Sequence, residues 1–243
     1  MSAPVFVVGT DRLRTGTVVV DGPEGRHAAT VTRLGVGEAV VLTDGLGRRG
    51  QGVVAAAARD RLEVTVTSVA DEPAHSLRLV VVQALPKGDR GELAVETMTE
   101  VGVDVVVPWA ASRCVTRWRD ARGEKALARW RTSAQAAAKQ SRRSRFPEVT
   151  DLATTGDVAA LLSRAAVGAV LHEQAAQPLA ALSLPDAGDV VLVVGPEGGV
   201  SDDEVGTFRD AGAATYRLGE TVLRTSTAGP AALAVLFARS RWL

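Results

Sequence analysis

The sequence predicts an α/β domain built on a parallel sheet, preceded by a small β-barrel-like domain. Up to about residue 72, short runs rich in β-branched residues are separated by Gly and Asp turns, which is typical of strands. Beyond residue 73, short apolar runs alternate with longer amphipathic segments. That pattern indicates strands that are buried on both faces and covered by helices. We therefore expect two domains, residues 1–72 and 73–243, joined at Asp71-Glu72-Pro73.

The first domain is expected to contain several strands and one short helix. Leu62–Val69 begins with alternating apolar and polar side chains, as a half-buried strand should. Val18–Asp21 and Ala39–Asp44 are the other expected strands, and His27–Leu34 is an expected helix. These segments are short and bounded by turn residues, which favours a compact barrel-like sheet.

A glycine-rich segment, Gly45–Gly50, has the G-x-G-x-x-G spacing of a dinucleotide-binding loop. It follows an expected strand, but an Ala run and another strand come after it, so no βαβ unit surrounds it. A hairpin opened by Asp44-Gly45 is the simpler interpretation. A dinucleotide-dependent oxidoreductase remains an alternative that depends on this motif alone.

The second domain is expected to alternate strands and helices along its whole length. Apolar runs predict strands at 77–85, 103–107, 167–172 and 190–194, and amphipathic segments predict helices at 89–101, 122–143, 158–164, 202–211 and 227–241. Because each strand is followed by a helix, the sheet should be parallel.

Composition argues against several classes of protein. No apolar run reaches the roughly 18 residues that span a bilayer, and the N-terminus lacks the pattern of a signal peptide. The single cysteine, Cys114, cannot form an internal disulfide, so we expect a cytoplasmic protein with no membrane partner. The three histidines are scattered without metal-ligand spacing, so we expect no metal.

One segment of the chain is strongly basic although the formal net charge of the whole is +0. Between Arg113 and Arg145 there are eleven basic and two acidic residues, which gives a local charge of +9. Such a segment suits a polyanion such as nucleic acid. The alternative is a solvated helix face, since the chain has many arginines throughout.

The segment from Gly195 to Ala228 carries the most informative motif. An apolar strand runs into Gly195-Pro196-Glu197-Gly198-Gly199, and Ser201 and Glu204 then have the spacing of a capping box, so a helix should follow. Gly-rich loops between a strand's carboxyl end and a helix are where α/β proteins bind ligands. The loop lacks the Lys-Ser/Thr of a phosphate-binding P-loop, which favours a nucleoside-like ligand. A purely structural turn is the alternative.

Other strand ends carry similar polar or Gly-rich segments. Leu171-His172-Glu173 ends one apolar strand, and Leu218-Gly219 and Leu223–Ala228 follow the loop at Gly195. Because the carboxyl ends of parallel strands meet at one edge of a sheet, these segments predict a single composite pocket.

These motifs, in this order, resemble the ribosomal small-subunit RNA uridine-N3 methyltransferase family of the SPOUT superfamily. The resemblance covers nearly the whole chain. It includes Leu85–Arg90, Thr99–Val103, the basic helix end from Gln140 to Glu148, and His27 to Glu38 in the first domain. The sequence differs from the family pattern at Ser226 and Lys139, where Glu is common, at Arg142, where Gly is common, and in lacking an Arg before Arg12.

The resemblance implies a trefoil-knotted SPOUT domain, an N-terminal PUA-like barrel and a homodimer with shared RNA sites. It implies S-adenosyl-L-methionine as cofactor and ribosomal RNA or the small ribosomal subunit as partner. The expected cofactor-binding residues are Leu171, His172, Glu173, Gly195, Pro196, Glu197, Gly198, Gly199, Leu218, Gly219, Leu223, Arg224, Thr225, Thr227 and Ala228. The expected RNA-binding residues are Arg33, Lys87, Arg90, Arg142, Arg143 and Arg145.

The chemistry of such a transfer suggests which residues act. Uridine N3 is weakly nucleophilic until it loses its proton, so a base or a cation that stabilises the uridine anion is needed. Arg224 is the expected cation, and Glu197 or Glu173 is the expected base, with a role in capping or in loop structure as the alternative for both carboxylates. Methylation of another RNA or of a ribose 2′-hydroxyl remains open, as does a non-catalytic RNA-binding ribosome-assembly factor.

Overall fold

A computed structural model describes residues 3–242 and divides the chain into two compact units. The first unit comprises residues up to Ala74 together with Ala138–Phe146, and the second comprises His75–Ala137 and Pro147 onward. Residues 138–146, which the sequence analysis placed with the second domain, therefore group with the first. No helix among residues 3–242 is long and apolar enough to cross a membrane.

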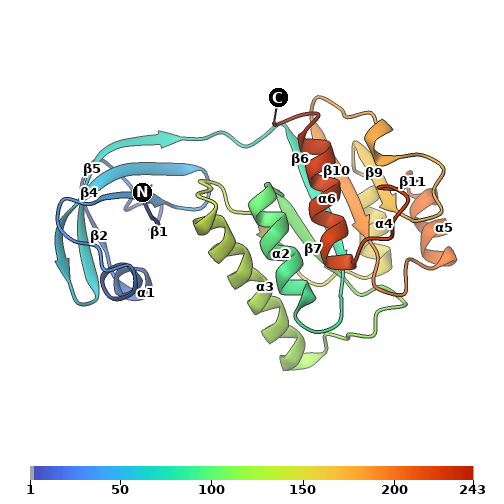
Figure 1. The fold of residues 1–243 in the computed structure, drawn as a ribbon, viewed down its shortest axis with the longest axis horizontal. Coiled ribbons are helices and arrows are strands. Elements are labelled where there is room, and N and C mark those ends of the chain that lie inside the picture. Colours follow the sequence, from blue (N-terminus) through green and yellow to red (C-terminus); the bar gives the residue numbers. More distant parts are fainter. Residues whose placement is uncertain (1–2, 243) are drawn as a thin grey trace. The chain divides into compact units, whose positions relative to one another are not determined.

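The first unit is built on a five-stranded sheet (Figure 1). Its strands lie in the order β1 (Val5–Val7), β3 (Ala39–Thr43), β4 (Arg48–Ala58), β5 (Arg61–Asp71) and β2 (Gly16–Val20). Only the β1–β3 pair is parallel. Inward-facing side chains such as Phe6, Leu42 and Leu62 form a separate apolar core.

The expected strands of this unit are confirmed to within two residues, but two features differ. The expected helix over His27–Leu34 is confirmed only in part, because α1 (Gly22–Arg26) precedes it and a single π turn covers His27–Val31. Strand β4 was not predicted, since its sequence is an Arg, Gly and Ala run with few β-branched residues. Pairing with β3 and β5 on its two sides stabilises it in spite of this composition.

Gly45–Gly50 is the β3–β4 hairpin, so the hairpin interpretation is confirmed. Asp44 Oδ1 accepts hydrogen bonds from the amides of Leu46 and Arg48, which closes the turn. At Gly47, φ is +112°, and a Cβ would lie 2.5 Å from the carbonyl oxygen of Glu72. The glycine is thus required by close backbone approach and not by a nucleotide.

Residues 144–146 bond to this hairpin around an isolated β-bridge between Arg145 and Leu46. The amide of Gly47 donates to Ser144 O at 3.0 Å, and that of Phe146 donates to Gly45 O at 2.8 Å. The hydroxyl of Thr43, which is fully buried, also donates to Ser144 O. These bonds explain why the end of the basic segment belongs to the first unit.

The second unit is a six-stranded, wholly parallel sheet in the order β11-β9-β10-β6-β7-β8. Its strands are β6 (Leu77–Ala84), β7 (Val105–Trp109), β8 (Glu148–Val149), β9 (Val167–Leu171), β10 (Gly188–Val194) and β11 (Ala214–Tyr216). The four apolar runs expected to be strands are confirmed, while β8 and β11 are too short to be recognised in the sequence. The central strands β6 and β10 are almost fully buried from Leu79 and Val190 onward.

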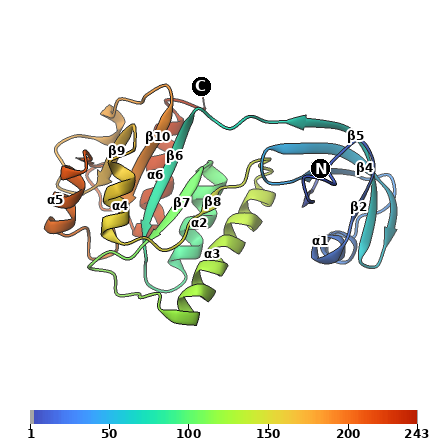
Figure 2. The same ribbon diagram turned by 180° about the vertical axis from the view of Figure 1, so that it is seen from behind.

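Helices cover both faces of this sheet. They are α2 (Arg90–Val101), α3 (Asp120–Gln140), α4 (Thr155–Leu162), α5 (Asp202–Asp210) and α6 (Thr225–Phe237), all close to the expected ranges. Helices α2 and α6 pack against each other on one face, and α4 contacts α5 on the other (Figures 1 and 2). Trp130 of α3 lies against Gly91, where a Cβ would approach the indole to 2.6 Å.

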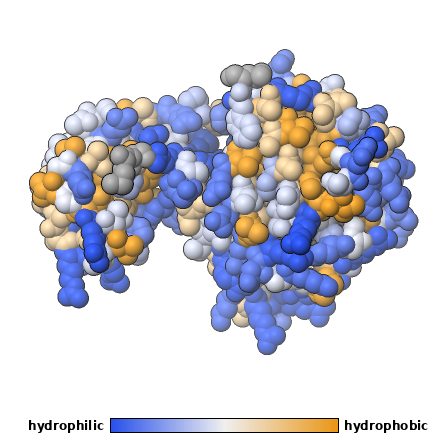
Figure 3. Space-filling model, viewed as in Figure 1, coloured by the Kyte–Doolittle hydropathy of each residue, from blue (hydrophilic) through white to orange (hydrophobic). Residues whose placement is uncertain are grey.

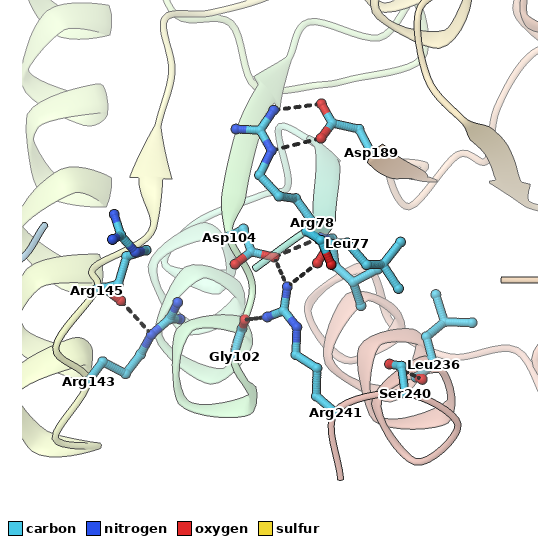
Figure 4. A network of polar contacts seen from close by, with 12 residues as sticks. Leu77, Arg78, Gly102, Asp104, Arg143, Arg145, Asp189, Leu236, Ser240 and Arg241 are labelled. Atoms are coloured by element: carbon cyan, nitrogen blue, oxygen red, sulfur yellow. Dashed lines mark hydrogen bonds and ion pairs between the residues drawn. The ribbon is translucent and has the colours of Figure 1, made fainter. Parts of the chain in front are cut away.

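Charged side chains fix the amino-terminal edge of the sheet (Figure 4). Arg78 of β6 makes a two-pronged ion pair with Asp189 of β10, with N–O distances of 2.8 and 2.7 Å. Asp104 accepts from the amide of Leu79 and from Arg241, which follows α6. Ion pairs and hydrogen bonds therefore stabilise the amino-terminal edge of the sheet. The loops that follow β9, β10 and β11 lie at the opposite, carboxyl edge.

Candidate cofactor site

Three neighbouring strands end at the same edge of the second sheet. β10 continues into Gly195–Gly199, β9 into Leu171–Glu173, and β11 into Leu218-Gly219. The amide of His172 donates to Tyr216 O at 2.9 Å, which holds two of these loops together. The order of the strands thus brings segments that are distant in sequence into one place.

A cavity of about 320 Å³ lies between these loops and the start of α6. A volume of this size suits a small organic ligand such as a nucleoside derivative. Its walls combine glycines with apolar and charged side chains. The lining residues are Arg90, Leu171, His172, Glu173, Val194, Gly195, Pro196, Glu197, Gly199, Val200, Tyr216, Arg217, Leu218, Gly219, Thr221, Val222, Leu223, Arg224, Thr225 and Ala228.

The structure brings together all of the expected cofactor-binding residues except Gly198 and Thr227, which lie outside the lining. Arg90, expected to bind RNA, lines the cavity as well. Tyr216 and Arg217 also line it, but they were missed because β11 is a three-residue strand with no apolar run.

The start of α5, the helix that follows the Gly195–Gly199 loop, stabilises this loop. Ser201 and Glu204 form the predicted capping box, in which the amide of Ser201 donates to Glu204 Oε2 at 3.0 Å. Ser112 donates its own amide to Glu204 Oε1 at 2.7 Å. Burial by itself would raise the pKa of the Glu204 carboxyl, but the hydrogen bonds from Ser112 and Ser201 lower it below its usual value.

Arg113 contacts the same loop from outside the cavity. Its Nη1 donates to Gly198 O at 3.1 Å, and a Cβ on Gly198 would lie 3.2 Å from Arg113 Cβ. Sequence analysis counted Arg113 only as part of the basic segment. The one sequence signal for a different role is its place just after strand β7, whose carboxyl end meets the same edge of the sheet.

Glu197 at the rim of the cavity is already engaged. Its Oε1 accepts from the backbone amide of Lys87 at 3.1 Å and lies 3.4 Å from Arg90 Nη1. The carboxylate thus connects the Gly195–Gly199 loop to the loop that precedes α2. This is the arrangement expected of a residue that holds two loops in place.

Arg224 and Glu173 differ from Glu197 in having no partner. Both side chains are exposed at the cavity, and neither forms a hydrogen bond or ion pair with any residue from 3 to 242. Arg224 is the N-cap residue of α6, so its backbone is fixed while its guanidinium is left available. Like that of Arg217, these two side chains are therefore available to a ligand of the cavity.

The basic segment proves to be partly structural. Lys139 binds both carboxylate oxygens of Glu24 at 2.7 and 2.8 Å, and Arg145 Nη2 donates to Glu72 O at 3.0 Å. Arg143 Nε donates to Arg145 O at 2.9 Å (Figure 4). The Lys139–Glu24 pair therefore gives this lysine a structural role within the first unit.

Arg142 and Arg33 are exposed and lie in the left-handed region, with φ of +60° and +56°. At Arg142 the hydrogen bonds Arg142 N to Lys139 O and Arg143 N to Ala138 O form a Schellman motif at the end of α3. Glycine is the usual residue at this position of the motif, so arginine adopts this backbone conformation at a steric cost.

The arrangement is a ligand site at the carboxyl edge of a parallel sheet, the class of site that α/β enzymes use for nucleotide-like cofactors. The sequence profile of the RNA methyltransferase domain family matches residues 73–237, and that of the RNA methyltransferase PUA domain matches residues 20–67. The chain therefore belongs to the RNA methyltransferase family.

Individual relatives are similar to this chain over nearly its full length. The chain is 47% identical to the ribosomal RNA small subunit methyltransferase E of Mycobacterium bovis, over 100% of this chain and 94% of that protein. It is 27% identical to the protein of the same name from Bacillus subtilis, over 90% and 89%. Its fold matches that of the Neisseria gonorrhoeae enzyme solved with S-adenosylmethionine, with a TM-score of 0.86, 26% identity and 98% coverage of each chain.

Proposed function

We propose that the protein transfers a methyl group from S-adenosylmethionine to N3 of a uridine in the RNA of the small ribosomal subunit. The observation that carries the proposal is the cavity formed at the ends of β9, β10 and β11. Family membership and the 47% identical relative support methylation of small-subunit ribosomal RNA. The division into domains at residues 72 and 73 and a cytoplasmic location belong to the proposal.

The residues present fit this cofactor. Gly195 lies so close to Val200 that a Cβ would approach its Cγ2 to 2.8 Å, so backbone forms the wall at that point. The residues Leu171–Glu173, Gly195–Gly199, Leu218-Gly219 and Leu223–Ala228 would hold the adenosine part through backbone groups. The sulfonium supplies an activated methyl group when bound, so the protein mainly has to align the nucleophile with it, and the proposal includes no metal.

The chain's own side chains would then manage the charge on the uridine. Arg224 would stabilise the anion that forms when N3 loses its proton, and the adjacent Glu173 or Glu197 would accept that proton. Glu173 has no partner among residues 3–242, which favours it, whereas Glu197 bonds Lys87 and Arg90. Comparing Glu173→Gln with Glu197→Gln tests this. The base is the residue whose replacement lowers kcat the more at neutral pH without changing cofactor affinity.

RNA contacts are proposed for Arg33, Lys87, Arg90, Arg142, Arg143 and Arg145, which would position phosphates without reading sequence. Arg142 and Arg33 are the most accessible of the set in the first unit. If changing Arg142 and Arg33 to Gln left RNA affinity and its salt dependence unchanged, neither arginine would belong to the proposed RNA interface.

A homodimer is part of the proposal, and we propose the exposed side of α6 as its surface. Figure 3 shows apolar side chains gathered over α6 on this face of the second unit. Leu93 of α2 is 50% exposed, and Ala231, Ala234 and Val235 of α6 are only half-buried. The resemblance also implies that the chain is knotted around the cavity. A monomer at micromolar concentration in sedimentation would contradict the dimer, and Leu93→Asp should weaken it.

The experiment that tests the function is a methylation assay with ribosomal RNA and with small subunits from cells lacking the modification. Nuclease digestion and mass spectrometry of the product should yield 3-methyluridine. A 2′-O-methylated nucleoside would instead support the alternative within the superfamily. Absence of S-adenosylhomocysteine binding in calorimetry would favour a non-catalytic RNA-binding factor.

A further inference from the structure

Gln83 is a fully buried polar side chain at the carboxyl end of β6, where the neighbouring residues are apolar. Its Nε2 donates to the carbonyl oxygen of Ala84 at 3.1 Å and to Thr225 Oγ1 at 2.9 Å. A backbone carbonyl can only accept, so the amide must present its nitrogen on this side. The orientation of the Gln83 side chain is thereby fixed.

This orientation determines the direction of the next hydrogen bond. The Thr225 hydroxyl has a single proton, and its oxygen already accepts from Gln83. The proton is therefore directed to Gly195 O, which lies 2.8 Å from Thr225 Oγ1. A directed chain of hydrogen bonds thus runs from β6 through the first turn of α6 to the first residue of the cofactor loop.

The Gly195–Pro196 peptide, which receives this hydrogen bond, has fewer hydrogen-bonding groups than other peptides. Gly195 is followed by Pro196, which has no N–H, so the Gly195 carbonyl is the only hydrogen-bonding group of that peptide. Both Gly195 and Thr225 line the cavity, whereas Gln83 does not. The orientation of this peptide sets where the rest of the loop begins.

Packing alone does not account for Gln83. Its Oε1 is buried and has no hydrogen-bond donor among residues 3–242, and a Cβ on Gly229 would come within 3.6 Å of it. An apolar side chain of similar shape would fill this space without burying an unpaired oxygen. The residue therefore has a cost that its bonds to Thr225 and Ala84 must offset.

We propose that Gln83 is a positioning residue for the cofactor loop: it orients the Thr225 hydroxyl and, through it, the Gly195 carbonyl. It does not touch the cofactor or the RNA. The inference rests on the proposed function only in taking the ligand of the cavity to be S-adenosylmethionine.

A double-mutant cycle tests the coupling between the two side chains. Gln83→Met keeps the shape and removes the donor, and Thr225→Val keeps the shape and removes the hydroxyl. Each should weaken S-adenosylhomocysteine binding in calorimetry by about 5–10-fold, the range expected for losing one buried hydrogen bond. The double variant should have the same affinity as the single variant that binds more weakly, because both changes break the same chain of hydrogen bonds. Thr225→Ser should retain near wild-type affinity.

A second variant gives a readout that a merely structural role would not produce. In Gln83→Glu the protonated carboxyl can still donate to Thr225, but the carboxylate can only accept and would draw the Thr225 proton away from Gly195. Burial should raise the pKa of the introduced carboxyl above its ordinary value of about 4.3. Its affinity for S-adenosylhomocysteine, divided by that of the wild type, should therefore fall as pH rises from 5.5 to 8.5.

Multiplicative effects in the cycle, or a pH-independent affinity ratio for Gln83→Glu, would overturn the proposal. Failure of the proposed function would look different, since the wild type itself would then not bind S-adenosylhomocysteine. In that event hydrogen exchange of the ligand-free protein still decides the point. The amides of residues 197–200 should exchange faster in Gln83→Met than in the wild type, and equal rates would contradict the role of Gln83.

Discussion

Two glycine-rich loops follow buried strands in this protein, and they do opposite things. Gly45–Gly50 turns β3 back into β4, and Gly47 makes room for the neighbouring backbone at Glu72. Gly195–Gly199 leads β10 into α5, and it lines a cavity of about 320 Å³. What distinguishes them is the element that follows. A returning strand fills the space beside the loop with backbone, whereas a helix on the far side leaves that space open to a ligand.

The largest effect should come from removing the charge beside the second loop. Arg224→Ala is expected to lower kcat for methylation by roughly 100–1000-fold, the range seen when a group that stabilises transition-state charge is lost. Cofactor affinity should change by less than about threefold, since the expected contacts at Arg224 are through its backbone. Rates at saturating cofactor and RNA, with calorimetry, check both.

The matched change at the first loop is Arg48→Ala. Arg48 Nε donates to Leu13 O, and its guanidinium pairs with the exposed Asp71. Methylation by this variant should stay within about twofold of wild type if the hairpin serves structure only. A loss comparable to that of Arg224→Ala would erase the distinction between the two loops.

Glycine replacements compare the loops directly. Gly47→Ala should destabilise the protein by about 2–4 kcal/mol, because φ is +112° and the new Cβ would lie 2.5 Å from Glu72 O. Gly195→Ala should weaken S-adenosylhomocysteine binding by roughly tenfold, because its Cβ would push Val200 and the loop outward. Urea unfolding should show the loss of stability mainly in Gly47→Ala, and calorimetry should show the loss of affinity mainly in Gly195→Ala. If both variants lost stability and affinity alike, the comparison would be contradicted.

A smaller effect is expected at the helix cap beneath the second loop. Glu204→Gln should lower stability by about 1–2 kcal/mol at pH 7, through weaker hydrogen bonds from Ser112 and Ser201. The lowered pKa of the Glu204 carboxyl means that its contribution is present above about pH 4.5 and is lost as pH falls through the folded-state value. The gap between variant and wild type should therefore narrow below pH 4.5 in thermal unfolding, and a constant gap would contradict this account.

The smallest effect should have the opposite sign. Arg142→Gly is expected to stabilise the protein by about 1 kcal/mol, because glycine adopts φ of +60° without the steric cost that arginine bears. The same change should weaken RNA binding two- to fivefold and reduce its salt dependence by one phosphate contact. Gain of stability without loss of RNA affinity would remove Arg142 from the proposed interface.

Most of the fold could be predicted from the sequence because most of its elements are determined by neighbouring residues. Runs such as Val190–Val194 are apolar on both faces, and Ser201 with Glu204 marks a helix start whatever lies around it. Strand β4 and the three-residue β11 escaped because their pairing partners, not their own residues, stabilise them. Short strands of this kind become visible only when the neighbouring strand is in place.

The candidate site divides in the same way. Loops next to recognisable strands were placed around the cavity from the sequence alone. The roles of Gln83 and Arg113 were not, because each acts on a residue more than eighty positions away in the chain. Glu197 shows the converse, since its motif suggested chemistry whereas its bonds to Lys87 and Arg90 connect two loops.

The β-bridge between Arg145 and Leu46 has a consequence for dividing the protein into shorter polypeptides. A polypeptide that ends at Glu72 would leave the amide of Gly47 and the carbonyl of Gly45, both in the turn between β3 and β4, without their partners from residues 144–146. It would also uncover the surface at Gly45 on which the ring of Phe146 packs. Unpaired backbone groups of this kind can pair with strands of other molecules. The isolated first domain, which ends at Glu72, should therefore self-associate. A peptide spanning residues 138–146 should restore the monomer.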